Sequence, residues 1–176
     1  MRRSGLPVLI TALAVSPASA HVGLENKHAA VGSYYKAVFT VPHGCAGSPT
    51  TKVRVQIPEG VIGIKPMPKT GWTLETVKGK YAATYEFHGA KVSEGVKEVV
   101  WSGGKLADDN YDEFVMATYL TDGLKANTTL YFPVVQECEQ GVSRWIDIPA
   151  AGQGGGHSHG HGSKSPAPGL KLIAKP

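Results

Sequence analysis

Hydrophobic and polar residues alternate in short runs between residue 33 and residue 149. Tyr35, Ala37, Phe39 and Val41 lie at every second position, and Val53, Val55 and Ile57 do the same. A period of two places every second side chain on the same face of an extended strand, and β-branched and aromatic residues are common at these positions. No stretch carries a sustained apolar stripe at the 3.6-residue period of a helix. The pattern therefore predicts an all-β protein.

Glycine and proline punctuate this region and separate the runs. The strand candidates are 35–41, 53–57, 72–77, 80–87, 98–101, 111–119, 128–135 and 142–148, and the turns between them fall at 42–44, 58–60, 69–71, 102–104 and 121–123. Pro133 lies inside one run and predicts an edge position or a break there. About seven to nine short strands with such turns are typical of an antiparallel β-sandwich of the immunoglobulin, fibronectin-III or cupredoxin type. A small barrel is the competing architecture.

Residues 1–20 have the pattern of a secretory signal peptide. Arg2-Arg3 gives a positive start, an apolar run follows at 6–15, and small residues lead up to Ala20. The apolar run is shorter than the roughly 20 residues that a membrane-spanning helix needs. We expect cleavage between Ala20 and His21, a periplasmic or extracellular protein, and no membrane span in the mature chain.

Export also bears on the two cysteines, Cys45 and Cys138. In an oxidising compartment their expected state is a disulfide bond. It would close a loop of about 93 residues, for which chain entropy gives roughly 4–5 kcal/mol of stabilisation. The alternative is a pair of thiolate metal ligands, which is disfavoured because neither cysteine belongs to a closely spaced CxxC pair.

The charge of the chain argues against nucleic acid as a partner. The formal net charge of the full chain is +4. Loss of the signal peptide, which contains two arginines, would lower this charge. Lysine and arginine are scattered along the chain, so no basic stripe forms. The length fits one domain that is large enough to bury a core.

The composition changes after residue 149. Residues 150–162 are mostly glycine and histidine, and the remainder is rich in proline, lysine and alanine without periodicity. Such a sequence buries too little apolar surface to order itself, so we expect a folded domain at 21–149 and a flexible tail at 150–176. Histidines that alternate on a flexible backbone can recruit Cu²⁺, Ni²⁺ or Zn²⁺, which makes the tail an accessory metal site through His157, His159 and His161.

Few residues of the predicted domain suggest chemistry by themselves. A histidine at the mature amino terminus carries an α-amine and an imidazole that can close a chelate ring on one metal ion, which makes His21 a candidate ligand. His43 lies in the turn before Cys45 and is either a ligand or, as is more usual for a turn histidine, bonded to nearby backbone. Asp112 and Glu113 begin a strand with side chains on opposite faces, so only one of them can face a given pocket.

Motifs along the whole predicted domain together resemble the YcnI-like family of secreted bacterial copper-binding domains. They are His21 after the signal peptide, VPHGC at 41–45, PTTKV at 49–53, IPEGV at 57–61, KPMPKTGW at 65–72, WSGG at 101–104, DEF at 112–114 and RW at 144–145. The resemblance implies a β-sandwich that binds one Cu²⁺ per domain through a single-histidine brace.

The resemblance also implies a set of site residues. The amine and imidazole of His21 would bind the ion, with Glu113, or else Asp112, as the carboxylate ligand. Trp145, or else Trp101, would lie beside the copper. Cu²⁺ takes tetragonal nitrogen and oxygen donors, which an amine, an imidazole and a carboxylate supply.

The function that follows is non-enzymatic: copper storage, buffering or delivery to another copper-trafficking protein of the envelope. A copper-dependent oxidoreductase is one alternative, and His43 and His88 are the candidates for the second histidine that such enzymes use. An immunoglobulin-like interaction module without a functional metal is the other.

Overall fold

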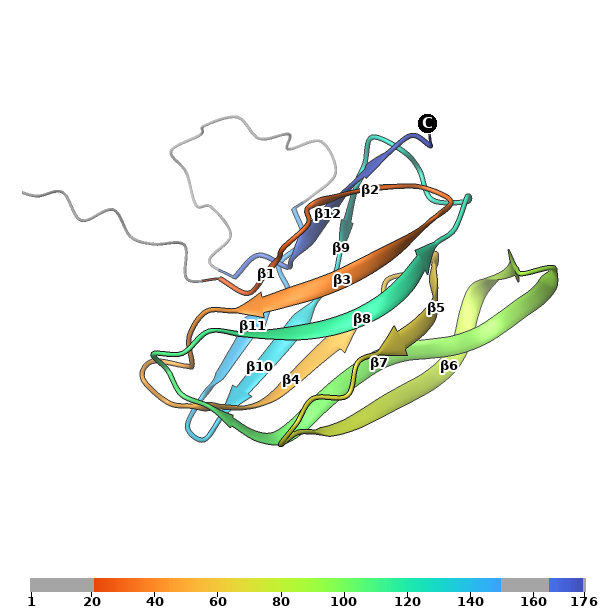
Figure 1. Ribbon diagram of the computed structural model, residues 1–176. Coiled ribbons are helices and arrows are strands. Elements are labelled where there is room, and N and C mark those ends of the chain that lie inside the picture. Colours follow the sequence, from red (N-terminus) through yellow and green to blue (C-terminus); the bar gives the residue numbers. More distant parts are fainter. Residues whose placement is uncertain (1–20, 150–164, 176) are drawn as a thin grey trace, which may run out of the picture.

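The computed structural model describes residues 21–149 and 165–175. Every helix or strand in this part of the chain is a β-strand (Figure 1), which confirms the all-β prediction. The strands are β1 (Gly23–Leu24), β2 (His28–Ala30), β3 (Ser33–Val41), β4 (Thr50–Gln56), β5 (Val61–Pro66), β6 (Thr73–Phe87), β7 (Ala90–Leu106), β8 (Asp112–Leu120), β9 (Thr129–Tyr131), β10 (Val134–Cys138), β11 (Val142–Trp145) and β12 (Gly169–Ile173). The predicted signal peptide and its cleavage site lie outside the described residues.

Two antiparallel sheets form the sandwich. One has the strand order β1-β3-β8-β5 and the other the order β11-β10-β4-β7-β6. A small third sheet, β2-β12-β9, adjoins the first at one end (Figure 1) and contains the parallel pair β2 and β12. The arrangement is the predicted antiparallel sandwich with one parallel pair added.

The alternation seen in the sequence sets the inner faces of both sheets. Tyr35, Ala37, Phe39 and Val41 are all buried on β3, and the predicted inner residues of β4 are buried opposite them. Apolar side chains of the two sheets therefore meet in one core cluster, whose removal from water is the main stabilising term of the fold.

The second half of the sandwich differs from the prediction in strand length. Residues 72–77 and 80–87 fall almost entirely within one strand, β6, which pairs with β7 in a long hairpin (Figure 1). The predicted turn at 102–104 is wrong, because it lies within β7. Gly103 there has a φ of 80° and the pairing of β7 with β4 changes register, so the glycines make a bulge instead. Pro133 separates β9 from β10, as the sequence indicated.

The end of the chain corrects the prediction of a flexible tail. Residues Gly169–Ile173 form β12, which pairs with β2 and β9, and its Leu170 and Leu172 are buried in the core cluster. Two alternating leucines are too weak a local signal for a strand, but two strand edges distant in sequence supply their partners. The folded region therefore extends past residue 149 to include β12, while His157, His159 and His161 lie outside the described residues.

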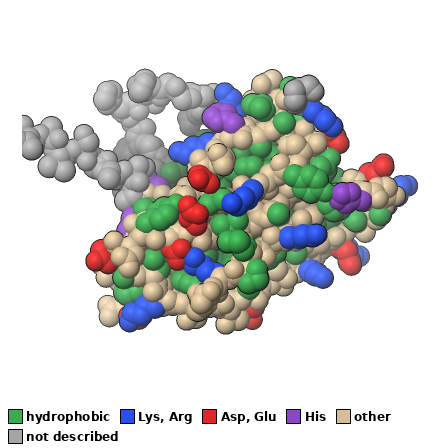
Figure 2. Space-filling view, viewed as in Figure 1, with side chains coloured by type: hydrophobic (Ala, Val, Ile, Leu, Met, Phe, Trp, Pro, Cys, Tyr) green, Lys and Arg blue, Asp and Glu red, His purple; other side chains and the backbone are tan. Residues whose placement is uncertain are grey.

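Charges of both signs are interspersed over the face shown in Figure 2. Ion pairs on the sheet that contains β4 join Arg54 to Glu98 and Lys52 to Glu137. Within the described ranges, no helix is long and apolar enough to cross a membrane.

Candidate metal centre

One end of the sandwich brings together three residues that are far apart in the sequence. His21 precedes β1, His43 follows β3, and Trp145 ends β11. The ring centroids of His21 and Trp145 are 5.1 Å apart and those of His43 and Trp145 are 6.5 Å apart, both in edge-to-face geometry. We call these three residues the histidine end. The sequence predicts Trp145 beside the copper ion, and in the structure its ring lies against that of His21.

A buried amide holds the indole in place. Trp145 Nε1 donates a hydrogen bond of 3.0 Å to Oε1 of Gln136, which is completely buried. The Nε2 atom of the same amide donates to the His43 carbonyl oxygen and to Thr50 Oγ1, at 2.7 Å each. Because every polar atom of this amide has a partner, one side chain fixes both the indole and the backbone at His43.

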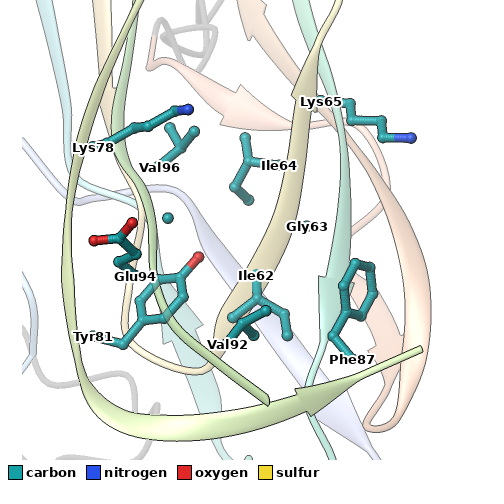
Figure 3. A pocket seen from close by; sticks show the side chains of 11 residues that line it. Ile62, Gly63, Ile64, Lys65, Lys78, Tyr81, Phe87, Val92, Glu94 and Val96 are labelled. Carbon is teal, nitrogen blue, oxygen red and sulfur yellow. The ribbon is translucent and has the colours of Figure 1, made fainter. Parts of the chain in front are cut away.

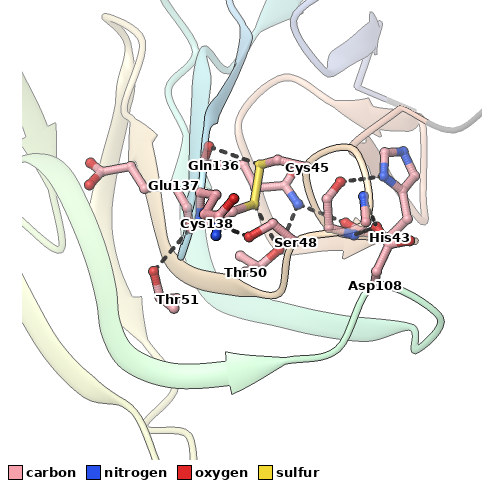
Figure 4. The surroundings of a disulfide bond; sticks show 12 residues. His43, Cys45, Ser48, Thr50, Thr51, Asp108, Gln136, Glu137 and Cys138 are labelled. Carbon is pink, nitrogen blue, oxygen red and sulfur yellow. Dashed lines mark hydrogen bonds between the residues drawn. A yellow bond between two sulfur atoms is a disulfide. The ribbon is translucent and has the colours of Figure 1, made fainter.

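The loop that carries His43 is fixed at several further points (Figure 4). The predicted disulfide between Cys45 and Cys138 is present, which excludes the alternative of two thiolate ligands. Asp108 Oδ1 accepts hydrogen bonds from the backbone N–H groups of Gly44 and Gly47, at 3.0 and 3.2 Å. A covalent bond and hydrogen bonds therefore anchor the loop that carries His43.

The His43 ring is itself bonded to this loop. Its Nδ1 atom makes a short hydrogen bond to the carbonyl oxygen of Gly44. A carbonyl oxygen can only accept, so Nδ1 must carry the proton, and in the neutral ring the lone pair belongs to Nε2. His43 is therefore bonded to nearby backbone through Nδ1, as is usual for a histidine in a turn.

The two candidate carboxylates have different surroundings. Asp112 pairs with Lys69, whose Nζ lies 2.6 Å from Asp112 Oδ1, and the same oxygen accepts the backbone N–H of Glu113. Glu113 Oε1 accepts a hydrogen bond of 2.5 Å from the hydroxyl of Tyr111. This bond, followed by burial and nearby negative charge, raises the pKa of Tyr111 to about 12. Asp112 is thus committed to a cation, whereas Glu113 is bonded to a neutral phenol.

The sheet register relates Glu113 to the start of the chain. Glu113 on β8 pairs with Thr40 on β3, and Thr40 pairs in turn with Gly23 on β1. Three strands in register place Glu113 and Gly23 about 10 Å apart, since neighbouring strands lie roughly 4.8 Å apart. Among residues 21–149 and 165–175, no three His, Cys, Asp or Glu side chains already converge as a metal site. A metal at His21 therefore needs the amine that cleavage would create or a movement of neighbouring side chains.

Trp101, the alternative tryptophan, belongs to the core. It is completely buried, packs against Phe114 with ring centroids 5.5 Å apart, and donates from Nε1 to the Met67 carbonyl oxygen at 3.1 Å. Trp72 also packs against Phe114, with ring centroids 4.9 Å apart. Of the predicted pair, Trp145 is the tryptophan that contacts His21.

Sequence reasoning missed Gln136. The sequence does contain a hint of its role. Gln136 is a polar residue at an inward-facing position of β10, two residues after the buried Val134 and two before Cys138. An amide in the inward phase of an apolar strand must find buried partners, and here these are the two elements of the histidine end.

Sequence reasoning also missed a cleft between β5 and the β6–β7 hairpin (Figure 3), which we call the hairpin cleft. It has a volume of about 290 Å³ and is lined by Ile62, Gly63, Ile64, Lys65, Lys78, Tyr81, Phe87, Val92, Glu94, Gly95 and Val96. Near the hairpin tip, His88 Nε2 lies 2.6 Å from the Tyr34 hydroxyl. His88, in the turn between β6 and β7, therefore joins the tip of the hairpin to Tyr34 of β3.

Comparison with known proteins places the chain in a family. The crystal structure of an uncharacterized protein from Nocardia farcinica, described as having an immunoglobulin-like fold, is similar with a TM-score of 0.63 and 25% identity, over 88% of this chain and 99% of that one. No curated protein sequence matches the chain. Residues 21–172 match the family described as "Domain of unknown function (DUF1775)". The chain therefore belongs to the DUF1775 family, which is the YcnI-like family, and folds as an immunoglobulin-like β-sandwich.

Proposed function

We propose that this protein is exported and binds Cu²⁺ for storage, buffering or delivery to another copper-trafficking protein of the envelope. It acts by binding and not by catalysis, with one ion per domain held by the amine and imidazole of His21. The observation that carries the proposal is the contact of the exposed His21 ring with the buried Trp145, 5.1 Å between centroids. The indole covers one side of the residue at which the mature chain would begin.

The donor set suits cupric ion. An α-amine and an imidazole on one residue form a chelate, and a carboxylate offsets part of the double positive charge. Glu113 is the better candidate for that carboxylate, because Asp112 is held by Lys69 at 2.6 Å. Glu113 also lies in the row of residues that leads through Thr40 to Gly23.

Copper affinity is expected to fall as the pH falls. The ion must displace the proton of the α-amine, whose ordinary pKa is about 7.7–8.0, and below this range protons compete more strongly.

The test compares two secreted chains: one that begins at His21, verified by mass spectrometry, and one with a single alanine ahead of His21. Both carry serine at positions 157, 159 and 161, so that the tail cannot bind copper. We expect the extra residue to lower Cu²⁺ affinity at least about tenfold and to change the nitrogen couplings in electron paramagnetic resonance, because it removes the chelating amine. His28→Ala, a substitution of an exposed histidine on β2, is the control.

Equal affinities and spectra for the two chains would contradict the brace. No uptake at one equivalent by the chain beginning at His21 would favour the immunoglobulin-like interaction module. Sustained release of oxidised products from chitin or cellulose in the presence of peroxide would favour the copper-dependent oxidoreductase over the carrier.

A further inference from the structure

We infer that the tip of the β6–β7 hairpin forms a binding site for a quaternary ammonium group, such as the trimethylammonium head of choline or of a choline lipid. We call this site the aromatic cage. It consists of the residues that line one cavity of about 260 Å³: Tyr34, Glu86, Phe87, His88 and Tyr119. Pockets for drug-sized ligands measure roughly 300–1,000 Å³, so this smaller cavity suits a small head group. The inference is independent of copper binding.

The first argument is the position of the hairpin tip. Tyr34 and Tyr119 are directly opposite each other on β3 and β8. Tyr34 is 61% exposed whereas the adjacent Tyr35 is buried, so the pair lies on the face of this sheet that points away from the core. Phe87, at the end of β6, lies so close to β5 that a Cβ on Gly63 would be 2.7 Å from its ring. The hairpin, which belongs to the other sheet, therefore places its tip against the outer face of this one.

The second argument is the arrangement of the rings, which contact one another in a closed cycle. Tyr119 lies between Tyr34 and Phe87, with ring centroids 5.2 and 5.4 Å away. His88 completes the cycle, 4.3 Å from Phe87 and 6.2 Å from Tyr34. Because neighbouring centroids are at most 6.2 Å apart, the centre of the four rings lies within about 6 Å of each, which is the range of cation–π attraction.

The relative tilt of the rings also favours a cation over a flat ligand. The interplanar angles around the cycle run from 31° to 66°, so the rings surround a space and do not form one flat stacking surface. Three of the four belong to tyrosine or phenylalanine, whose ring faces attract cations. A quaternary ammonium ion has no N–H to donate, so ring faces and a nearby carboxylate are the partners that it can use.

A turn and a hydrogen bond hold His88 in the cycle. His88 and Gly89 form the two-residue turn between β6 and β7, with φ values of 52° and 76°, as a type I′ turn requires. Histidine is uncommon in this left-handed region. The hydrogen bond of 2.6 Å between His88 Nε2 and the Tyr34 hydroxyl joins the turn to β3. The cage is thus closed between segments that are 54 residues apart in the chain.

The third argument is charge. Glu86 lines the cavity and is exposed. Lys91 is opposite Glu86 in the hairpin ladder, but the ion pairs of residues 21–149 and 165–175 do not include either of them. Burial, followed by the charges of Asp122 and Tyr34, raises the pKa of Tyr119. The Glu86 carboxylate is therefore available to offset the charge of a bound cation.

The test is a nuclear magnetic resonance titration of the ¹⁵N-labelled chain that begins at His21. Choline chloride is compared with 3,3-dimethylbutanol, which has the same shape without the charge. We expect choline to shift the backbone amides of residues 86–89 and 119 and to bind at least about threefold more tightly than the alcohol. Equal affinities would mean that the cavity recognises shape and not charge, which would overturn the inference.

Vesicles distinguish the two sources of the head group. Binding to phosphatidylcholine vesicles and not to phosphatidylglycerol vesicles, in the absence of binding to free choline, would support a lipid as the source. Binding to free choline would support the soluble molecule. If neither free choline nor phosphatidylcholine vesicles shift the amides of the cage, the inference is wrong.

Substitutions at exposed positions test the residues. Tyr34→Leu is expected to weaken choline binding at least about threefold, whereas Tyr34→Phe, which keeps the ring, is expected to stay within about twofold of the unmutated protein. Glu86→Gln is expected to weaken binding about twofold, and Glu75→Gln, exposed on the same strand, is its control. Thermal unfolding shows whether each variant remains folded. A folded Tyr34→Leu variant that binds choline as tightly as Tyr34→Phe does would overturn the inference.

Discussion

The histidine end and the hairpin cleft lie in different parts of the same sandwich and are held together by different means. At the histidine end, a completely buried amide, a disulfide and a buried indole fix the residues. Next to the hairpin cleft, polar contacts near the surface join the β6–β7 hairpin to the turn before β5. Glu59 accepts hydrogen bonds from the Tyr85 hydroxyl and the Ala82 backbone N–H, and it pairs with Lys97 at 2.9 Å.

This difference in burial indicates which of the two regions deforms more easily. Breaking a buried hydrogen bond so that one partner stays unsatisfied costs about 1–3 kcal/mol, whereas an exposed ion pair contributes about 0–1 kcal/mol. His43 and Trp145 are thus expected to keep their positions whether or not a ligand is present. The hairpin cleft is expected to open and close at little cost.

The largest effect is expected from strand β12, whose Leu170 and Leu172 belong to the core cluster. The chain that leads into β12 is bonded to the segment after Trp145, because the backbone N–H of Ala167 donates to the Asp147 carbonyl. Leu170→Ala removes a completely buried side chain and should lower the free energy of unfolding by about 2–5 kcal/mol, measured by urea denaturation. Ile173→Ala, at a side chain that is 43% exposed, is the control. Unchanged stability of Leu170→Ala would mean that β12 is not part of the folded domain.

A smaller effect is expected at Gly63, in the hairpin cleft. Gly63 has a φ of 64°, and an added Cβ would lie 2.7 Å from the ring of Phe87. Gly63→Ala should therefore cost about 1–3 kcal/mol, as backbone strain and a displaced aromatic ring add. Gly89→Ala is matched in backbone, with a φ of 76° and no atom within 4 Å of the added Cβ. Thermal unfolding of the two variants separates strain from the Phe87 contact, and equal losses would show that Phe87 does not pack on Gly63.

The smallest effect is expected from Glu59, and it depends on pH. Burial alone would raise the pKa of Glu59, but hydrogen bonds from Tyr85, Lys97 and the Ala82 backbone outweigh it and lower the pKa. The stabilisation is therefore complete above the unfolded-state value of about 4.3 and is lost as the pH falls through the lower folded-state value.

Glu59→Gln should accordingly lower the unfolding midpoint slightly at pH 7, by the equivalent of less than about 1 kcal/mol, and not at all at pH 2. The exposed Glu75→Gln on β6 is the control. A Glu59→Gln deficit that is the same at pH 7 and pH 2 would mean that the charge of Glu59 does not hold the hairpin.

Several features of the fold could be predicted from the sequence because their causes are local. Alternation alone identified the inner face of β3, and all four residues from Tyr35 to Val41 that it selected are buried. Proline at 133 broke a strand because it lacks the N–H that a ladder needs. Two cysteines in a chain expected to be exported predicted the disulfide.

The tertiary structure decided what depends on partners distant in the chain. The leucines of β12 became a strand because β2 and β9 offered edges to it, and Gly103 became a bulge because β4 continued beyond it. Only folding brought His43 and Trp145 onto the amide of Gln136 and placed His21 against the same indole. A sequence states which side chains face inward within one strand, because that depends on a period of two. Which strands meet, and therefore which residues form a site, depends on contacts that no local pattern records.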